Sequence, residues 1–413
     1  MIESKVIRLA GDKSISHRAL MISSISRGSN RITNLCDSKD VQATINCLRL
    51  CGACIEKSRN GYIVSSSSLS NPSKPLNCEN SGTTIRLLMG LLVGQGIEAE
   101  LYGDISLMNR PMNRVINPLK QIGANIVFRN KFFCIKKGLI RGGSITNITS
   151  SAQVKSAIIL AALGASKKTI LKESYSTRDH TERMISYFSK DILHARGKNI
   201  EINPSSFSGR NIDIAGDISK ASFLIAFGCL SEGANLIIEN CLINSSRMGF
   251  VNNLKKMGAD IRINNKKIKY GESVGDICVK YGARLKNIRI SPQNVRDMID
   301  EIPILSVVAA FSKGVMSING ISELKIKESN RVFAIISNLK KMSCDIRENK
   351  DSLLIKGRKN LYNTRIKTFS DHRIAMAFYI ASLFAKRRSV LDDLECIDIS
   401  FPHFFDKLAE VRT

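Results

Sequence analysis

The sequence predicts an α/β protein built from several copies of one unit, because a short pattern recurs along the chain. The pattern is Leu-x-x-x-Gly-Ala-x-Ile, and its copies are Leu48–Ile55, Leu119–Ile126, Leu254–Ile261 and a degenerate Leu339–Ile346. Their starts lie 71, 135 and 85 residues apart, so the middle gap is close to two units. Self-similarity at a fixed period indicates repeated supersecondary units, and a unit of about 70 residues fits roughly six times into this chain.

Each copy of the pattern is typical of the end of an amphipathic helix, a glycine stop and a strand. Val251, Leu254 and Met257 fall at i, i+3 and i+6 and predict one apolar helix stripe. Gly258 follows, and glycine is the residue that most easily takes the left-handed conformation after a helix. Residues 259–263 then alternate as a strand does. Further strand patterns precede the helices, at residues 234–239 and 315–319.

The two halves of the chain begin alike, which predicts two lobes. Gly216–Ala221 resembles the opening segment Gly11–Ser16. We therefore expect residues 12–214 to form the first lobe, and residues 1–11 together with 215–413 to form the second, with three repeats in each.

The composition indicates a globular protein, and its positive charge has two interpretations. Hydrophobic residues make up 43% of the chain and charged residues 24%. The formal net charge of +26 is compatible with a nucleic-acid-binding protein or with a Lys-rich composition. Tryptophan is absent and aromatics are only 6%, so few side chains are available for stacking on bases. No apolar run follows the first residues, and we expect a cytoplasmic protein without a membrane span.

The eleven cysteines do not predict a disulfide framework or a metal site. Cys47, Cys51 and Cys54 have a C-x3-C-x2-C spacing, which iron–sulfur enzymes also use. Cys51, however, falls where the other copies of the repeat carry Ile or Met, so we expect it to be a core residue. We expect no metal and no cofactor.

The segment Gly11–Arg18 is the first candidate for a binding site. It follows a short strand candidate and opens an apolar helix, and it carries Lys13, Ser14 and Arg18. The N-terminus of a helix offers free N–H groups and a partial positive charge, which bind anions. A capped helix with exposed cations would have the same sequence.

Several other segments share this combination of small or polar residues and charges at a predicted helix start. They are Asn80–Arg86, Met108–Arg114, Ser150–Lys155, Thr177–Arg183, Asp297–Pro303, Lys327–Arg331 and Ser370–Arg373. The spacing of Lys327 and Arg331 predicts that they share one helix face. If these segments face one cleft, they would bind two phosphates and two carboxylates, and an acidic residue of Asp297–Pro303 would supply a general base.

In this order, the motifs resemble those of the enolpyruvyl transferases that act on shikimate 3-phosphate. The matching runs include Gly-Asp-Lys-Ser-Ile-Ser-His-Arg, Asn-Ser-Gly-Thr-Thr-Ile-Arg, Ser-Ala-Gln-Val-Lys, Arg-Asp-His-Thr-Glu, Met-Ile-Asp-Glu, Lys-Glu-Ser-Asn-Arg and Asp-His-Arg-Ile-Ala-Met. The resemblance implies a two-lobed, inverse α/β barrel-like fold with six βαββαβ repeats, three per lobe. It also implies transfer of the enolpyruvyl group of phosphoenolpyruvate to the 5-hydroxyl of shikimate 3-phosphate, in the shikimate pathway to chorismate and aromatic amino acids.

The resemblance further implies the residues of the site. Those for shikimate 3-phosphate are Lys13, Ser14, Arg18, Ser151, Gln153, Arg178, Asp300 and Lys327. Those for phosphoenolpyruvate are Lys13, Gly82, Arg110, Gln153, Arg331 and Arg373. The catalytic residues would be Asp300 as the base, Glu328 as a proton donor, and Lys327 and Lys13 beside the reacting groups.

Two departures and two alternatives accompany this interpretation. Ala10 stands where the family usually has proline, and Ile399 where one subclass has a phosphate-binding lysine. The nearest alternative is a UDP-N-acetylglucosamine enolpyruvyl transferase of the same fold, and another is an RNA-binding or RNA-end-processing protein of similar repeats. We expect a monomer that binds small anionic substrates, with no nucleic acid and no membrane.

Overall fold

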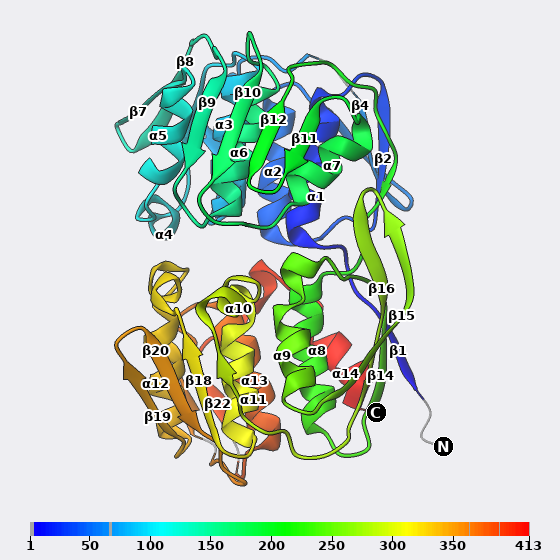
Figure 1. Ribbon diagram of the computed structural model, residues 1–413, viewed down its shortest axis with the longest axis vertical. Helices are drawn as coiled ribbons and strands as arrows, with labels where there is room; N and C mark the ends of the chain where they lie inside the picture. The colour runs from blue at the N-terminus through cyan, green and yellow to red at the C-terminus, as the bar shows by residue number, and fades with distance from the viewer. Residues whose placement is uncertain (1–3, 66–67, 363, 388, 413) are drawn as a thin grey trace. The chain divides into compact units, whose positions relative to one another are not determined.

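The computed structural model describes residues 4–65, 68–362, 364–387 and 389–412, and these divide into two compact units (Figure 1). The N-terminal unit consists of Gly11–Ile214 and the short segment Ile268–Glu272. The C-terminal unit consists of the described residues of Met1–Ala10, Ala215–Lys267 and Ser273–Thr413. The chain therefore passes from one unit to the other at four places.

Three four-stranded sheets surround three central helices in the N-terminal unit. The helices α1 (Lys13–Ile25), α3 (Gly82–Gly94) and α6 (Ala152–Ala162) contact one another and are buried on nearly all sides. Most residues of these helices are buried, including the polar Ser16, His17 and Arg18 of α1, because each helix has neighbours on several faces. The amphipathic helices α2 (Lys39–Leu50), α5 (Asn113–Gln121) and α7 (His180–Phe188) complete the layer, with the short α4 (Ile105–Met108) before α5.

The sheets of this unit share one strand pattern. Their orders are β13-β2-β4-β3, β5-β6-β8-β7 and β11-β12-β10-β9. Their strands are β2 (Ser29–Thr33), β3 (Cys54–Ser58), β4 (Gly61–Ser65), β5 (Leu76–Asn77), β6 (Ala99–Tyr102), β7 (Asn125–Arg129), β8 (Phe132–Lys136), β9 (Gly143–Asn147), β10 (Thr169–Glu173), β11 (Leu193–Arg196), β12 (Asn199–Ile202) and β13 (Ile212–Asp213).

The C-terminal unit repeats this plan around α8 (Ile218–Leu230), α11 (Ile302–Phe311) and α13 (His372–Phe384). Its sheets have the orders β1-β14-β16-β15, β17-β18-β20-β19 and the two-stranded β21-β22. The strands are β1 (Lys5–Arg8), β14 (Asn235–Leu242), β15 (Asp260–Lys269), β16 (Glu272–Lys280), β17 (Arg289–Ile290), β18 (Val315–Asn319), β19 (Asp345–Asn349), β20 (Ser352–Lys356), β21 (Arg365–Ile366) and β22 (Val390–Leu391). The outer helices are α9 (Gly249–Lys256), α10 (Pro292–Arg296), α12 (Arg331–Lys341) and α14 (Phe404–Arg412), and the 3₁₀ turns are η1 (Ser245–Arg247), η2 (Ile299–Glu301), η3 (Ser322–Ile326) and η4 (Glu395–Ile399).

The predicted class of fold, with six repeats and three in each unit, is confirmed. Within a repeat, however, the order is βαβαββ, as in β9-α6-β10-α7-β11-β12, and not the βαββαβ order that was expected. Among the described residues the sixth repeat is abbreviated, because its sheet has only β21 and β22.

Strands β1 and β13 are exchanged between the units. β1 pairs in parallel with β14, with Lys5 opposite Leu236. β13 pairs in parallel with β2, with Ile212 opposite Ile32. β1 therefore completes a sheet of the C-terminal unit, although the next helix, α1, belongs to the N-terminal unit. β13 completes a sheet of the N-terminal unit, although the next helix, α8, belongs to the C-terminal unit. The chain crosses between the units directly after each of these strands.

The recurring pattern has the predicted structure in every copy. α2, α5, α9 and α12 end just before its glycine or serine, and β3, β7, β15 and β19 begin two residues after it. Gly258 has φ +101°, and Ser343 takes the same left-handed conformation with φ +65° in the degenerate copy. Cys51 is a fully buried core residue, as predicted, and burial raises the pKa of its thiol to about 12.

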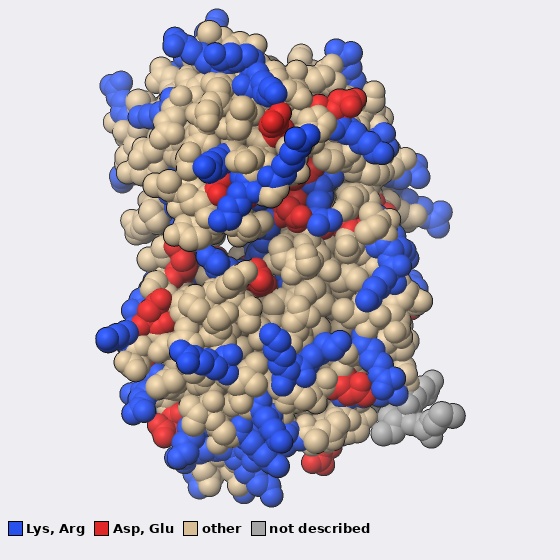
Figure 2. All heavy atoms as spheres, in the orientation of Figure 1, with Lys and Arg blue, Asp and Glu red and all other residues tan. Residues whose placement is uncertain are grey.

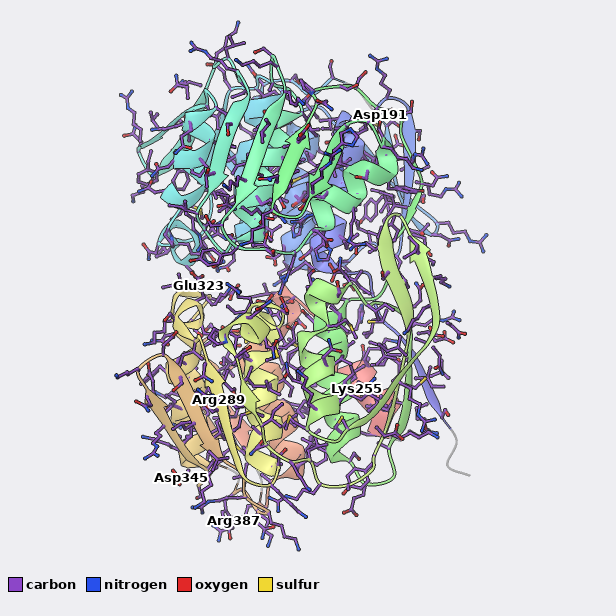
Figure 3. All side chains as sticks on the ribbon, in the orientation of Figure 1. Asp191, Lys255, Arg289, Glu323, Asp345 and Arg387 are labelled. Atoms are coloured by element: carbon purple, nitrogen blue, oxygen red, sulfur yellow. The ribbon has the colours of Figure 1, made fainter. Side chains whose placement is uncertain are left out.

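Charged side chains cover much of the surface of both units. On the face shown in Figure 2, Lys and Arg are spread over each unit with Asp and Glu among them. The side chains labelled in Figure 3 include Asp191, Lys255, Arg289 and Arg387, which occupy exposed positions. Among the residues that the structure describes, no helix is both long and apolar enough to cross a membrane.

Candidate active site

Most of the predicted site residues lie at the N-terminal ends of helices. Lys13, Gly82 and Arg331 are the first residues of α1, α3 and α12, and Ser151 is the N-cap of α6. Arg178 comes two residues before α7, Asp300 lies in η2 directly before α11, and Arg373 is the second residue of α13. Each segment therefore places the positive end of a helix beside a polar or charged side chain.

A buried arginine connects three helices in the N-terminal unit. The Arg18 guanidinium donates to Thr181 Oγ1 at 2.7 Å, to Ser156 Oγ at 2.7 Å and to the backbone oxygen of Ser14 at 2.8 Å. Burial lowers the pKa of Arg18 to about 10, although Glu182, Asp12 and Glu272 favour its charged form. Arg18 therefore remains a cation at neutral pH and is held in one orientation.

A second network in the same unit surrounds Gly82. Gln153 accepts from Arg86 Nη1 at 2.6 Å and donates to Thr83 Oγ1 at 2.9 Å, which joins α6 to the start of α3. Arg110 donates to Asn80 Oδ1 at 2.8 Å. A Cβ atom added to Gly82 would lie 2.7 Å from Arg86 Nη1 and 3.0 Å from Arg110 Nη1, so both guanidinium groups lie against this glycine.

The remaining predicted residues of this unit are partly buried. Lys13 Nζ lies 2.6 Å from Asp40 Oδ2, and this pair is largely shielded from water. The side chains of Ser14, Ser151 and Arg178 are half-buried. The charge of Arg178 lowers the pKa of Arg18, so the two cations lie in the same electrostatic environment. An anion placed near them would relieve this repulsion.

Arg331 forms the centre of the site residues in the C-terminal unit. Its side chain is only 1% exposed, and it donates to Asp371 Oδ2 at 2.8 Å and to Glu328 Oε2 at 2.5 Å. Its Nη1 lies 3.7 Å from Asp300 Oδ1. Burial opposes the charge on Arg331, but Asp371, Glu328 and Asp300 outweigh it and raise its pKa above the ordinary value.

Asp371 holds two site segments together. Its carboxylate accepts from the backbone N–H of Arg373 at 2.9 Å at the start of α13, and from Ser329 Oγ at 3.0 Å. Burial alone would raise the pKa of Asp371, but the charge of Arg331 holds it below the ordinary value. Arg373 in turn donates to the backbone oxygen of Asp300 at 3.2 Å, so η2, α12 and α13 meet at this cluster.

One detail of the sequence interpretation is wrong. Lys327 does not share a helix face with Arg331, because α12 begins only at Arg331 and Lys327 follows the preceding turn η3. Ile399 at the end of η4 packs against the hydrophobic core, so this position supplies no cation.

The structure adds partners that were not assigned from the sequence. They are Asp40, Arg86, Ser156, Thr181 and Asp371. Arg86, Thr181 and Asp371 lie inside motifs named in the sequence analysis, and Ser156 directly follows one. Their polar side chains in these motifs could have indicated a role in the site. Asp40 carried no signal, because its pairing with Lys13 depends on the packing of α2 beside α1.

The fold and the two clusters define a protein with two repeat-built α/β units that hold cations at helix N-termini, the arrangement of an enzyme for small anionic substrates. The family model described as EPSP synthase (3-phosphoshikimate 1-carboxyvinyltransferase) matches residues 2–408. The chain belongs to this family.

Individual relatives agree with this assignment. A 3-phosphoshikimate 1-carboxyvinyltransferase from Alkaliphilus metalliredigens is 40% identical over 97% of this chain and 96% of its own. Another from Caldicellulosiruptor saccharolyticus is 42% identical over 97% and 95%. The solved EPSP synthase from Acinetobacter baumannii has a TM-score of 0.88 and 34% identity, covering 98% of this chain and 95% of that one. The enolpyruvyl transferase NikO from Streptomyces tendae, at 15% identity and a TM-score of 0.81 over 99% and 95%, shares the fold.

Proposed function

We propose that the chain transfers the enolpyruvyl group of phosphoenolpyruvate to the 5-hydroxyl of shikimate 3-phosphate and releases phosphate. The observation that carries this proposal is that the family's motifs lie at helix N-termini in both units, each with its cation or carboxylate anchored. Such an arrangement supplies cations and backbone N–H groups for two phosphates and two carboxylates. The reaction belongs to the shikimate pathway, and we place it in the cytoplasm.

The N-terminal unit supplies most contacts to shikimate 3-phosphate. Arg18 is charged and oriented by Thr181 and Ser156, which suits a bidentate contact with the substrate carboxylate beside Ser14. Ser151, Gln153 and Arg178 are the proposed contacts of its phosphate. Their helix starts, at α6 and before α7, add the dipole of each helix to these contacts.

The contacts proposed for phosphoenolpyruvate are those that the family resemblance implies. Gly82 has no side chain that would separate its backbone from the phosphate, and it lies next to Arg110, with Gln153 joined to the same network. Arg331 and Arg373 bind the carboxylate, and Lys13 lies near both substrates. Arg331 is surrounded by carboxylates, so its charge is fixed and its position does not depend on the substrate.

The reaction then follows from proton transfers around C2 and C3 of phosphoenolpyruvate. Glu328 donates a proton to C3, which makes C2 electrophilic, and Asp300 accepts the proton of the attacking 5-hydroxyl. Lys327 lies beside that hydroxyl in this assignment. Phosphate leaves from C2 of the tetrahedral intermediate while the methyl group returns a proton to the Glu328 carboxylate, which restores both the double bond and the proton donor. Positioning and charge neutralisation lower most of this barrier.

The test is the choice of acceptor. Purified protein is incubated with phosphoenolpyruvate and either shikimate 3-phosphate or UDP-N-acetylglucosamine, and phosphate release is followed. We expect release with shikimate 3-phosphate alone. Release only with the nucleotide sugar would assign the chain to the other enolpyruvyl transfer, and release with neither would refute the proposal. We expect the protein to act as a monomer on these small anions, with no nucleic-acid partner.

A further inference from the structure

The turn between β15 and β16 belongs to the N-terminal unit, although both strands lie in the second half of the chain (Figure 1). Three contacts hold it there. Lys269 Nζ lies 2.5 Å from Asp213 Oδ2, the backbone oxygen of Gly271 accepts from Arg183 Nη1 at 2.9 Å, and Glu272 Oε1 accepts from His180 Nδ1 at 2.7 Å. The last two contacts both end on α7.

Glu272 anchors the first turn of α7 from inside the protein. Glu272 and His180 have side chains that are each 1% exposed, so this pair is shielded from water. The second oxygen of Glu272 lies 3.9 Å from Arg183 Nε, which also contacts Asp179 at 2.7 Å. The N-cap of α7, Asp179, makes no side-chain capping hydrogen bond. The position of this helix start therefore depends on the turn that carries Glu272.

Three successive residues of that first turn contact three separate charged groups. His180 contacts Glu272, Thr181 accepts from Arg18 and donates to Ser156 at 2.7 Å, and Glu182 lies 2.6 Å from Lys155 Nζ. Arg178 lies two residues before the helix. A shift of the turn at His180 is therefore passed directly to the partner of Arg18 and to the backbone that carries Arg178.

The backbone of the turn at Gly271 lies very close to the backbone of α7. Gly271 has φ +81°, a conformation that other residues rarely adopt. A Cβ atom at Gly271 would lie 2.7 Å from the backbone oxygen of Arg183. The backbone of the turn and that of α7 therefore touch at a point where only glycine fits.

We propose that Glu272 is a positioning residue for the shikimate 3-phosphate site, acting through His180 on Arg18 and Arg178. The inference rests on the proposed function, because it uses the substrate contacts assigned there. Loss of the Glu272 carboxylate should therefore weaken the binding of shikimate 3-phosphate and not that of phosphoenolpyruvate. Glu272 contacts the elements that hold shikimate 3-phosphate, and it has no contact with Gly82, Arg110 or Arg331 among the interactions described above.

The test compares Glu272→Ala with two other variants under steady-state conditions. We expect Glu272→Ala to raise the KM for shikimate 3-phosphate about tenfold, because small misplacements of binding groups weaken binding strongly. The KM for phosphoenolpyruvate should change less than about twofold, since its contacts keep their supports. Glu272→Gln retains an acceptor for His180 and should return the first KM to within about threefold of the parent. Lys269→Ala, in the same turn but without contact to α7, should match the parent.

The outcomes separate this inference from the proposed function. A parent protein that releases no phosphate with both substrates refutes the function itself. An active parent with an unchanged KM for shikimate 3-phosphate in Glu272→Ala overturns the positioning role. Equal rises in both KM values, or a Lys269→Ala variant as impaired as Glu272→Ala, would show a general structural effect and also overturn it. If Glu272→Ala does not fold, a Gly271→Ala variant with unaltered KM for shikimate 3-phosphate contradicts the inference.

Discussion

Asp300 is placed to act as a base because its carboxylate is partly exposed and lies near the fixed cation Arg331. Its Oδ1 lies 3.7 Å from Arg331 Nη1, whereas Glu328 and Asp371 contact Arg331 directly. The Asp300 side chain is 21% exposed, so the hydroxyl of a substrate can reach it. When the carboxylate accepts a proton, Asp371 and Glu328 still pair with Arg331.

Removing this carboxylate tests its role. We expect Asp300→Ala to lower kcat by about two orders of magnitude or more, with KM values for both substrates largely kept. Steady-state measurements of phosphate release give kcat and both KM values. Glu323→Ala, on the separate turn η3, is the control. A folded Asp300→Ala variant with near-normal turnover would remove Asp300 from the mechanism.

In the proposed site, Gly82 lies beside the phosphoenolpyruvate phosphate, and its lack of a side chain leaves room there. Glyphosate, the family's inhibitor at this site, is longer than phosphoenolpyruvate. An added methyl group at Gly82 would press on the ends of Arg86 and Arg110, which are flexible and can move. We expect Gly82→Ala to raise the inhibition constant of glyphosate more than the KM for phosphoenolpyruvate. Gly282→Ala, where a Cβ meets nothing within 4 Å, is the control. An unchanged ratio of the two constants would show that Gly82 does not line the site.

His17 gives the stability a pH dependence of predictable sign. Burial lowers its pKa from 6.5 to about 3, so below pH 6.5 the unfolded chain binds a proton that the folded chain does not. Stability is therefore lost as pH falls from 6.5 towards 3. Between pH 7 and pH 5 this group alone should cost about 2 kcal/mol. Urea unfolding of the parent and of His17→Gln measures the difference, and equal pH slopes in the two proteins would contradict the buried neutral state.

Single residues were predictable where charge and position in a motif coincided. Arg18 and Arg331 stood out as cations inside motifs, and the family resemblance supplied their roles. Their partners could not be assigned with the same ease, since Ser156 and Thr181 reach Arg18 across 138 and 163 residues of chain. Lys327 was misplaced for a local reason, because the turn η3 ends where a helix was expected.

At the scale of elements, the start of α13 combines a helix cap with a buried ion pair. Asp371 caps this helix and pairs with Arg331, and both side chains are nearly inaccessible to water. We expect Asp371→Ala to lower the free energy of unfolding by about 3 kcal/mol or more, because it leaves a buried cation with fewer partners. Asn330→Ala, which removes only the cap of α12, should cost about 1 kcal/mol. Denaturant unfolding at pH 7 measures both, and equal losses would contradict the role of the ion pair.

Helices and strands marked by periodicity and turn residues were predicted well. The placement of a segment that depends on contacts distant in sequence was not predicted. The helix ends before Gly258 and Ser343 follow from periodicity and turn chemistry, so the four copies of the pattern could be read directly. The association of Ile268–Glu272 with the N-terminal unit has no such signal. It depends on His180, Arg183 and Asp213, which lie about 60 to 90 residues earlier in the chain.

At the scale of the whole molecule, the repeat explains why two units carry similar clusters. Each unit surrounds three apolar helices with outer sheets, so the starts of these helices are the places where polar side chains interrupt the core. The buried cations Arg18 and Arg331 are held there by carboxylates and hydroxyls. The exposed Lys and Arg side chains of Figure 2 are spread over the visible face, which agrees with a Lys-rich composition.

The most direct test of the proposed chemistry is the product balance of one incubation. The protein is mixed with phosphoenolpyruvate and shikimate 3-phosphate, and phosphorus and proton NMR follow both substrates. We predict that one phosphate is released for each enolpyruvyl ether formed at the 5-hydroxyl, and that none is released when shikimate 3-phosphate is omitted. Phosphate release without the ether, or equal release without the acceptor, would contradict enolpyruvyl transfer by this chain.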